Sequence, residues 1–491
     1  MIRTELKIKN AVLYLFLLCF AAAGCKKFTD EPYDDRAQLR SADQYQQVLV
    51  NAYPVRHDLF TDILTDDFDY HAQLAQASSV SNFLPIFMWK DDYPDNIAAG
   101  PANAYAEYYA KIFLANLALE GIGAATGSDQ QKAAVKGEAL LIRAYCHFIL
   151  VNIFGQHYNT ATSGSNLGVP LILTNAKGNI NTYKRNSVKE VYDQVEADIT
   201  NGLEQLKNGG SYVSVNPYHF SVATGNALMA RVKLYKGEWD QAVKYSDAVI
   251  KEKGYVVRKL SEDIPYLQSS GMLFFATRYM DPSSHPNILS LSYNATMGPL
   301  TPTGYFICGF FPSDSIVKQY NAVNGVSDLR QRVFTSVGTV IDVRVIALKF
   351  ATQANSPSNT PIRVPYFNME EVLLTHAEAL LRSNAGNAVQ AALTDVEAIR
   401  KERYLPYKPL DAAITKDALL NVVMLERRKE LINEGLRWYD IKRLNLPVEH
   451  RLARGGAPDD VLKANDLRKA IQIPRQEQER NAPIASELNP R

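Results

Sequence analysis

The sequence predicts a mostly helical, all-α protein in which long irregular loop regions interrupt pairs of helices. Three observations lead to this fold class. Apolar residues recur at helical spacing through about 104–252 and again through about 366–445. Two segments have the helix–turn–helix pattern of a tetratricopeptide repeat. Between them, about 254–365 has weak periodicity and many aromatic residues, which argues against disorder and suggests a functional insert.

The overall composition is that of a globular protein and excludes several classes. The chain has 491 residues, of which 46% are hydrophobic and 21% charged. Its net charge of +1 provides no electrostatic footprint for nucleic acid. The four cysteines, of which Cys146 is expected in the core, form no CxxC pair. The number and spacing of the cysteines therefore argue against a zinc ribbon and against a disulfide-stapled scaffold.

The N-terminus has the pattern of an export signal. Basic residues precede an apolar run at 11–23, which is shorter than the ~20 residues of a membrane-spanning helix. The sequence Ala-Ala-Gly-Cys at 22–25 resembles a bacterial lipobox, although Ala22 stands where Leu is usual. We expect a signal peptide at 1–24, lipidation of Cys25, a tether at 25–40 and one body at 41–491. The alternative is an ordinary signal peptide with an incidental cysteine.

The first half of the body has clear helix signals. Ser41 is a plausible N-cap for a helix over about 41–65, and 66–103 reads as loops rich in Asp and aromatic residues. Helices are then predicted over 104–122, over 129–154 after Ser128, and over 187–206 after Ser187.

The helix pairs come next. The segment 227–245 places Gly237 at a turn and Trp239 just after it, and a second pair spans about 368–402. Ordinary antiparallel helices are the alternative. A charge-rich helix is predicted over about 416–445, where Arg427 with Glu430, and Glu434 with Arg437, are close enough to pair.

Taken together, these landmarks resemble the SusD/RagB family of outer-membrane nutrient-binding lipoproteins of Bacteroidetes. The resemblance rests on segments whose order and spacing match over the mature chain: 28–32 after Cys25, 137–139, 143–145, 154–155, 237–242, 398–400, 430–441 and 473–474. It implies an all-α body that captures oligosaccharide, or in some members peptide. It also implies a lipid anchor in the outer membrane, surface exposure, and a SusC-like TonB-dependent transporter as partner. No catalysis and no cofactor are implied.

Motifs for other chemistry are absent from the sequence. No HExxH, GxSxG, GxGxxG or Walker A pattern occurs. His147 and His376 lie on predicted helices and are expected to be packed or surface groups rather than metal ligands. The acidic clusters at 66–69 and 91–95 could hold a hard cation such as calcium or be solvated loops, and neither matches an EF-hand.

Sugar recognition needs flat apolar faces with nearby polar groups, and Tyr and Trp offer both. Because the binding positions of relatives vary, the resemblance implies a region rather than residues. The candidates in the loop regions are Asp67, Trp89, Tyr93, Asn96, Arg278, Tyr279, Tyr293, Tyr305 and Tyr320. Any one of these aromatics could instead belong to a loop core. Two other functions stay open: a helical-repeat scaffold that binds no small ligand, and a secreted hydrolase with an Asp/Glu pair.

Overall fold

Helices build the frame of the protein, which is 56% helical. The computed structural model describes residues 39–71, 83–97, 100–176, 181–270, 281–283, 285–294, 309–338, 343–347, 349, 362–453 and 456–491. Ser41–Arg491 form one unit by their internal contacts. The predicted fold class, a mostly helical body with tetratricopeptide-like pairs, is confirmed.

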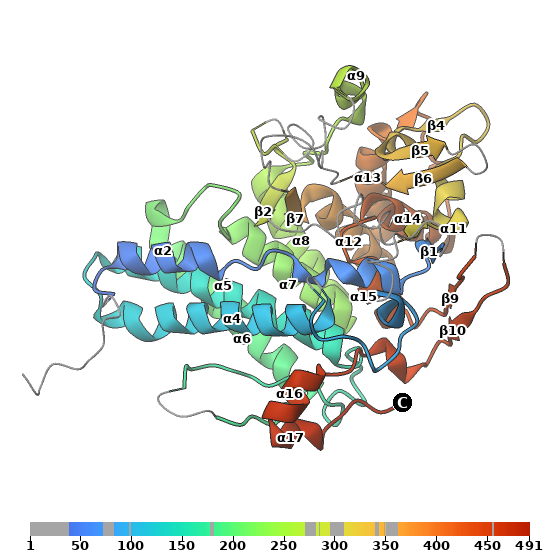
Figure 1. Ribbon diagram of the computed structural model, residues 1–491. Helices are drawn as coiled ribbons and strands as arrows, with labels where there is room; N and C mark the ends of the chain where they lie inside the picture. The colour runs from blue at the N-terminus through green and yellow to red at the C-terminus, as the bar shows by residue number, and fades with distance from the viewer. Residues whose placement is uncertain are drawn as a thin grey trace, which may run out of the picture. The chain divides into compact units, whose positions relative to one another are not determined.

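Four helices make the N-terminal part of the frame. Helix α5 (Asp129–Phe154) packs between α4 (Pro101–Gly121) and α6 (Val188–Gly209), and α2 (Ala42–Ala52) packs on α4 and α5 (Figure 1). The predicted caps are present, because Ser41, Ser128 and Ser187 each accept a hydrogen bond from the backbone N–H three residues later. Among the described helices, α5 is long and apolar enough to cross a membrane, but its apolar stretch is fully buried in the protein. It is therefore the core helix of this body.

The two predicted helix pairs are also present. Helix α7 (Val222–Lys236) packs on α8 (Trp239–Lys253), and α12 (Met369–Arg382) packs on α13 (Ala388–Lys401). Helix α12 also packs on α8 and on α14 (Lys416–Glu430), so the two pairs form one continuous stack. Gly237 ends α7 with φ of +75°, a conformation that suits glycine best.

Two predicted helices are each broken in the structure. The expected helix over 41–65 consists of α2 and the short 3-10 helix η2 (His57–Leu64). The expected helix over 416–445 is divided into α14 and α15 (Arg437–Arg443). Gly435 between them has φ of +70°, which turns the chain out of the first helix axis.

Contacts with distant segments change the partners of the charged residues in this region. The pairs expected within one helix, Arg427 with Glu430 and Glu434 with Arg437, are replaced by tertiary pairs. Arg427 Nε lies 2.9 Å from Asp440 Oδ2 on α15, and Arg437 Nε lies 3.0 Å from Asp66 Oδ1 in the N-terminal loop. In this buried region, the arginines form ion pairs with carboxylates that the fold brings close, and not with those of neighbours along the helix.

Short antiparallel strand pairs decorate the helical frame. The described part of the chain contains five two-stranded sheets. They pair β1 (Phe68–Tyr70) with β3 (Phe310–Pro312), β2 (Ile288–Asn294) with β7 (Ile362–Asn368), β4 (Ser327–Asp328) with β8 (Tyr404–Leu405), β5 (Phe334–Gly338) with β6 (Val343–Ala347), and β9 (Val448–His450) with β10 (Asp460–Leu462). The segment 254–365 that we expected to be irregular thus holds several strands, together with α9 (Leu260–Ser270), α11 (Asp314–Val317) and the 3-10 helices η7 (Lys318–Tyr320) and η8 (Leu329–Val333).

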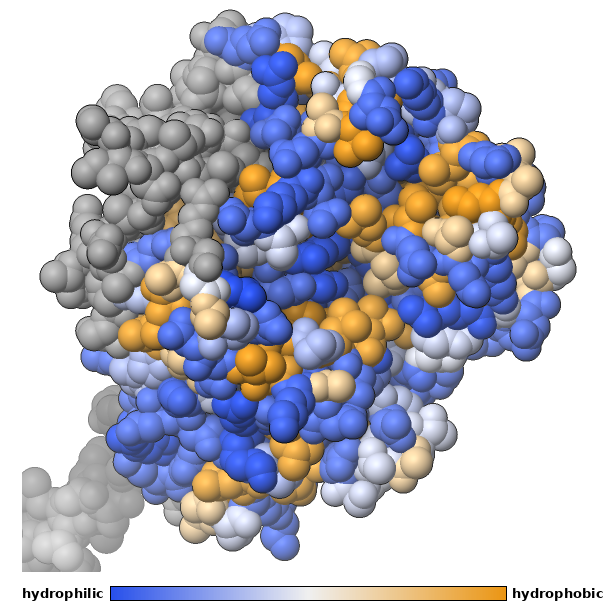
Figure 2. Space-filling model, turned by 90° about the vertical axis from the view of Figure 1, so that its right-hand side faces the viewer, coloured by the Kyte–Doolittle hydropathy of each residue, from blue (hydrophilic) through white to orange (hydrophobic). Residues whose placement is uncertain are grey.

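The remaining short elements fall at turns and near the C-terminus. They are η4 (Ile122–Ala124), η5 (Gly210–Tyr212), η9 (Leu467–Lys469), α16 (Arg475–Arg480) and α17 (Ala482–Ala485). Figure 2 shows the right-hand side of the view in Figure 1, where hydrophobic groups gather in separate patches within a mainly hydrophilic surface. Cys146 was expected in the core, and His147 was expected to be a packed or surface group. Both side chains are completely buried in α5.

Candidate functional site

Most of the described candidate residues in the first loop region are buried. Asp67 is 2% exposed, and its Oδ1 accepts a hydrogen bond of 2.6 Å from Arg428 Nε. Burial raises the pKa of Asp67 even though Arg428 opposes this shift, whereas Arg437 and Arg428 overcome the burial of Asp66 and lower its pKa. This carboxylate pair anchors the loop to α14 and α15.

Trp89 is enclosed by its neighbours. Its indole Nε1 donates to the Leu64 carbonyl at 3.2 Å, and its ring stacks on His450 with centroids 3.9 Å apart. The other face of His450 stacks on Phe87, also at 3.9 Å. With only 4% of its surface exposed, Trp89 offers no open face for a sugar ring in this conformation.

Tyr93 and Tyr320 use their hydroxyl groups to fix loops to the frame. The Tyr93 hydroxyl donates to the Gln472 carbonyl at 2.6 Å, and the Tyr320 hydroxyl donates to the Lys429 carbonyl at 2.9 Å. Both rings are buried. Burial is also the main reason why the pKa of each phenol is raised well above its ordinary value.

The other candidates have different positions. Asn96 is exposed in the turn that follows Tyr93. Tyr293 lies on β2 at the register position opposite Arg363 of β7. Arg278, Tyr279 and Tyr305 lie outside the described residues, as does Cys25. Four candidates are therefore buried where the loops contact the rest of the protein: Asp67, Trp89, Tyr93 and Tyr320. Asn96 is accessible to solvent.

Carboxylates of both acidic clusters contact arginines, and those of Asp91 and Asp92 are also exposed to solvent. Asp66 contacts Arg428 and Arg437, while the exposed Asp91 and Asp92 contact the C-terminal residues Arg491 and Arg475. Within the described ranges, no group of three or more His, Cys, Asp or Glu side chains is arranged to hold a metal ion. These carboxylates join distant parts of the chain.

A buried charge network holds the segment around Arg330 against α14. The sequence did not predict which residues pair in this network. Arg330 contacts Asp328, Glu426 and Glu430, and Arg403 also contacts Glu430. The density of charges in α14 was the available signal. It could not reveal that their partners come from segments about 25 to 100 positions away in the sequence.

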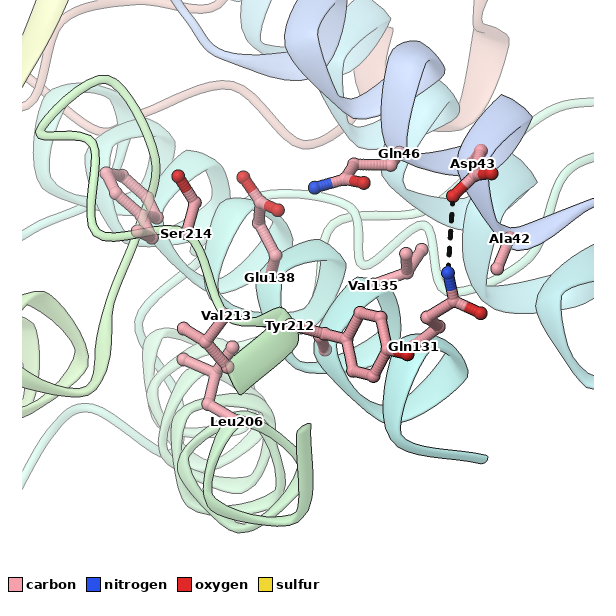
Figure 3. Close-up of a pocket in the computed structure, with 12 residues that line it drawn as sticks. Ala42, Asp43, Gln46, Gln131, Val135, Glu138, Leu206, Tyr212, Val213 and Ser214 are labelled. Atoms are coloured by element: carbon pink, nitrogen blue, oxygen red, sulfur yellow. Dashed lines mark hydrogen bonds between the residues drawn. The ribbon is translucent and has the colours of Figure 1, made fainter. Parts of the chain in front are cut away.

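One small pocket is too narrow for a sugar. It lies between α2, α5 and the segment 212–214, and its lining includes Gln46 and Glu138 (Figure 3). Its cavity volume is about 20 Å³, which is room for about one water molecule. This pocket is therefore too small to hold a saccharide ring.

Comparisons with known proteins agree with the helical frame. A family model described as starch-binding and associating with the outer membrane matches residues 27–234, and a model of the SusD family matches 343–488. SusD-like protein P38 of Formosa agariphila is 29% identical over 391 residues, which are 70% of this chain and 72% of that protein. These matches cover both helical parts of the body.

Solved structures share the fold. A SusD superfamily protein from Bacteroides thetaiotaomicron has a TM-score of 0.74 at 21% identity, covering 92% of this chain and 100% of that one. Surface glycan-binding protein A from Bacteroides fluxus has a TM-score of 0.65 at 18% identity, covering 90% and 97% of the two chains. A helical-repeat frame with loop-borne strand pairs places the protein in the SusD-like class. Within that class, the chain belongs to the SusD/RagB family.

Proposed function

We propose that the protein is a lipid-anchored, carbohydrate-binding protein of the bacterial surface that delivers oligosaccharide to a SusC-like TonB-dependent transporter. The observation that carries the proposal is the match of both halves of the body to family models, one of them described as starch-binding and associating with the outer membrane. The structural neighbour named as a surface glycan-binding protein supports the same ligand class. The role is binding rather than catalysis.

The proposed ligand surface consists of the loop regions 66–103 and 254–365. The residues between the two matched segments, 235–342, contain most of the second region. A loop-rich insert carried by a helical frame is suited to ligand selectivity, since binding residues are commonly placed on loops that a rigid scaffold positions. We propose that Asn96, Arg278, Tyr279, Tyr293 and Tyr305 contact the ligand.

In this proposal, the ligand surface is supported by four buried residues that do not contact the ligand: Asp67, Trp89, Tyr93 and Tyr320. Asn96→Ala should weaken oligosaccharide binding without changing the unfolding temperature, because the side chain is exposed. Trp89→Ala should instead destabilise the protein by about 3–5 kcal/mol, since it removes a buried indole. Isothermal titration and thermal unfolding of both variants separate these roles. Equal losses of stability would contradict the division.

The binding role is tested by titrating the protein with neutral hexasaccharides of glucose, xylose and mannose, and with short peptides. Oligosaccharide binding is expected. A protein that binds no member of the panel but still associates with outer-membrane proteins would instead be a scaffold. Turnover of a polysaccharide by the purified protein would favour a hydrolase.

The anchor and the partner have separate tests. Native protein should carry acyl chains on Cys25 by mass spectrometry, and Cys25→Ser should release it from the membrane fraction. Affinity purification from cells in mild detergent should recover a TonB-dependent transporter. Recovery of soluble, unmodified protein would refute the anchor, and its absence from transporter complexes would refute the partnership.

A further inference from the structure

A groove outside the proposed ligand surface has the size of a small-molecule site. It lies between α4, the described residues 170–176 and 181–183, and α16, and its cavity volume is about 480 Å³. This falls within the ~300–1,000 Å³ that is usual for ligand pockets. Figure 1 shows α4 and α16 on the lower side of the molecule, separate from the strands β4, β5 and β6 at its upper right.

Aromatic side chains form one wall of the groove. Tyr105, Tyr109 and Phe113 recur every four residues on α4 and line the cavity together with Tyr183. The rings of Tyr105 and Tyr109 are 4.8 Å apart, and the Tyr109 hydroxyl donates to the Pro170 carbonyl at 2.9 Å. Phe113 remains 51% exposed. The wall therefore combines fixed rings with one large open apolar face.

Asn175 lies against this aromatic wall. Asn175 is held by its Nδ2, which donates to the Phe113 carbonyl at 3.0 Å, yet its buried Oδ1 has no partner among the described residues. Leaving a buried acceptor unpaired costs about 1–3 kcal/mol. Because this oxygen has essentially no accessible surface, the polar groups that a ligand can reach lie on the α16 side of the groove.

Two opposite charges lie on the α16 side of the groove. Arg480 is exposed and forms no ion pair in the described part of the chain. Glu477 accepts a hydrogen bond of 2.9 Å at Oε1 from Asn481 Nδ2, which orients its carboxylate. Because these two charges are opposite and no other charged residue among the described residues lines the cavity, the described lining favours no net ligand charge.

We propose that this groove is a second, separate binding site for a short neutral oligosaccharide. Aromatic faces would cover the C–H surfaces of the sugar rings, and the Gln476 amide and the two charged groups would bind ring hydroxyls. A purely apolar ligand would leave these polar groups unpaired. This inference rests on the carbohydrate-binding function proposed above, but it assigns binding to different residues.

The test uses the whole mature protein, titrated with the same neutral hexasaccharides and with a trigalacturonate as an acidic comparison. Phe113→Ala and Arg480→Ala change exposed side chains, so both variants should fold. Each should weaken binding at one site about tenfold or more. Tyr212→Ala is the matched control, because Tyr212 is also exposed, at 44%, and lies outside the groove. Hydrogen exchange should show sugar-dependent protection of 102–113, and Asn96→Ala should leave this protection intact.

The outcomes are distinguishable. Sugar binding that is unchanged in both groove variants would overturn the second site while the proposed function stands. No binding of any sugar to the wild-type protein would overturn both. Preference for trigalacturonate, lost in Arg480→Ala, would refute a neutral ligand. Groove variants that lose only transporter association would identify the groove as a protein contact and would also overturn the proposal.

Discussion

The close crossing of α5 and α6 gives a quantitative prediction for Gly137→Ala. A Cβ atom at Gly137 would lie 2.8 Å from the backbone nitrogen of Leu206 and 2.9 Å from the carbonyl oxygen of Gly202. Both contacts are with backbone atoms, which cannot rotate away as a flexible side chain can. The methyl group therefore requires the two helices to move apart.

Two opposing contributions determine the size of the effect. Replacing glycine by alanine inside a helix favours folding by about 1 kcal/mol. Overpacking a close contact costs about 1–3 kcal/mol, and the upper part of this range applies because α5 is central to the frame. We therefore expect Gly137→Ala to lower the free energy of unfolding by about 1–2 kcal/mol.

Urea unfolding monitored by circular dichroism measures this difference. Gly123→Ala is the control, because no atom lies within 4 Å of its added Cβ. It should be neutral or stabilising by about 0.4–1 kcal/mol. If Gly137→Ala were as stable as the wild type, the reasoning from the helix crossing would be refuted.

Two further predictions concern buried charges. Arg231→Met should cost about 3–5 kcal/mol, because it leaves Glu371, whose side chain is 3% exposed and 2.6 Å from the guanidinium, without its ion-pair partner. The double variant Arg231→Met/Glu371→Gln should recover part of this loss in urea unfolding, and an equal loss in both would contradict the explanation. Burial would raise the pKa of Glu430, but Arg403 and Arg330 lower it well below its ordinary 4.5. Its stabilising contribution is therefore present above about pH 4.5 and is lost as the pH falls. Glu430→Gln should flatten the acid side of the profile of unfolding free energy against pH, and parallel profiles for variant and wild type would count against this role.

Local sequence signals were sufficient for the capped helices and for the two helix pairs. The Ser128 cap and the apolar run after it predicted α5 to the residue, and the Gly237 turn predicted the α7–α8 pair. These features depend on neighbours three or four positions apart, so a single sequence contains them. The family followed from the order of several such landmarks along the chain.

The candidate site could not be predicted at the same level. A sequence does not distinguish the buried Trp89 from an exposed loop tryptophan. Only the folded structure shows that His450, from a distant strand, stacks on its ring and covers it. The groove likewise joins α4 to α16, which are more than 350 positions apart. Its aromatic spacing on α4 was visible beforehand, but it is the spacing of any packed helix face.

The sequence by itself therefore determined the serine-capped starts of α2, α5 and α6, the two helix pairs, and the family to which the chain belongs. The tertiary structure decided where the long helices break, which carboxylate each arginine contacts, and which aromatic rings remain open to a ligand. The physical reason is the separation along the sequence between the residues that interact. Helix formation is set by backbone hydrogen bonds between residues four apart, whereas burial and ion pairing depend on which distant segments the fold brings together.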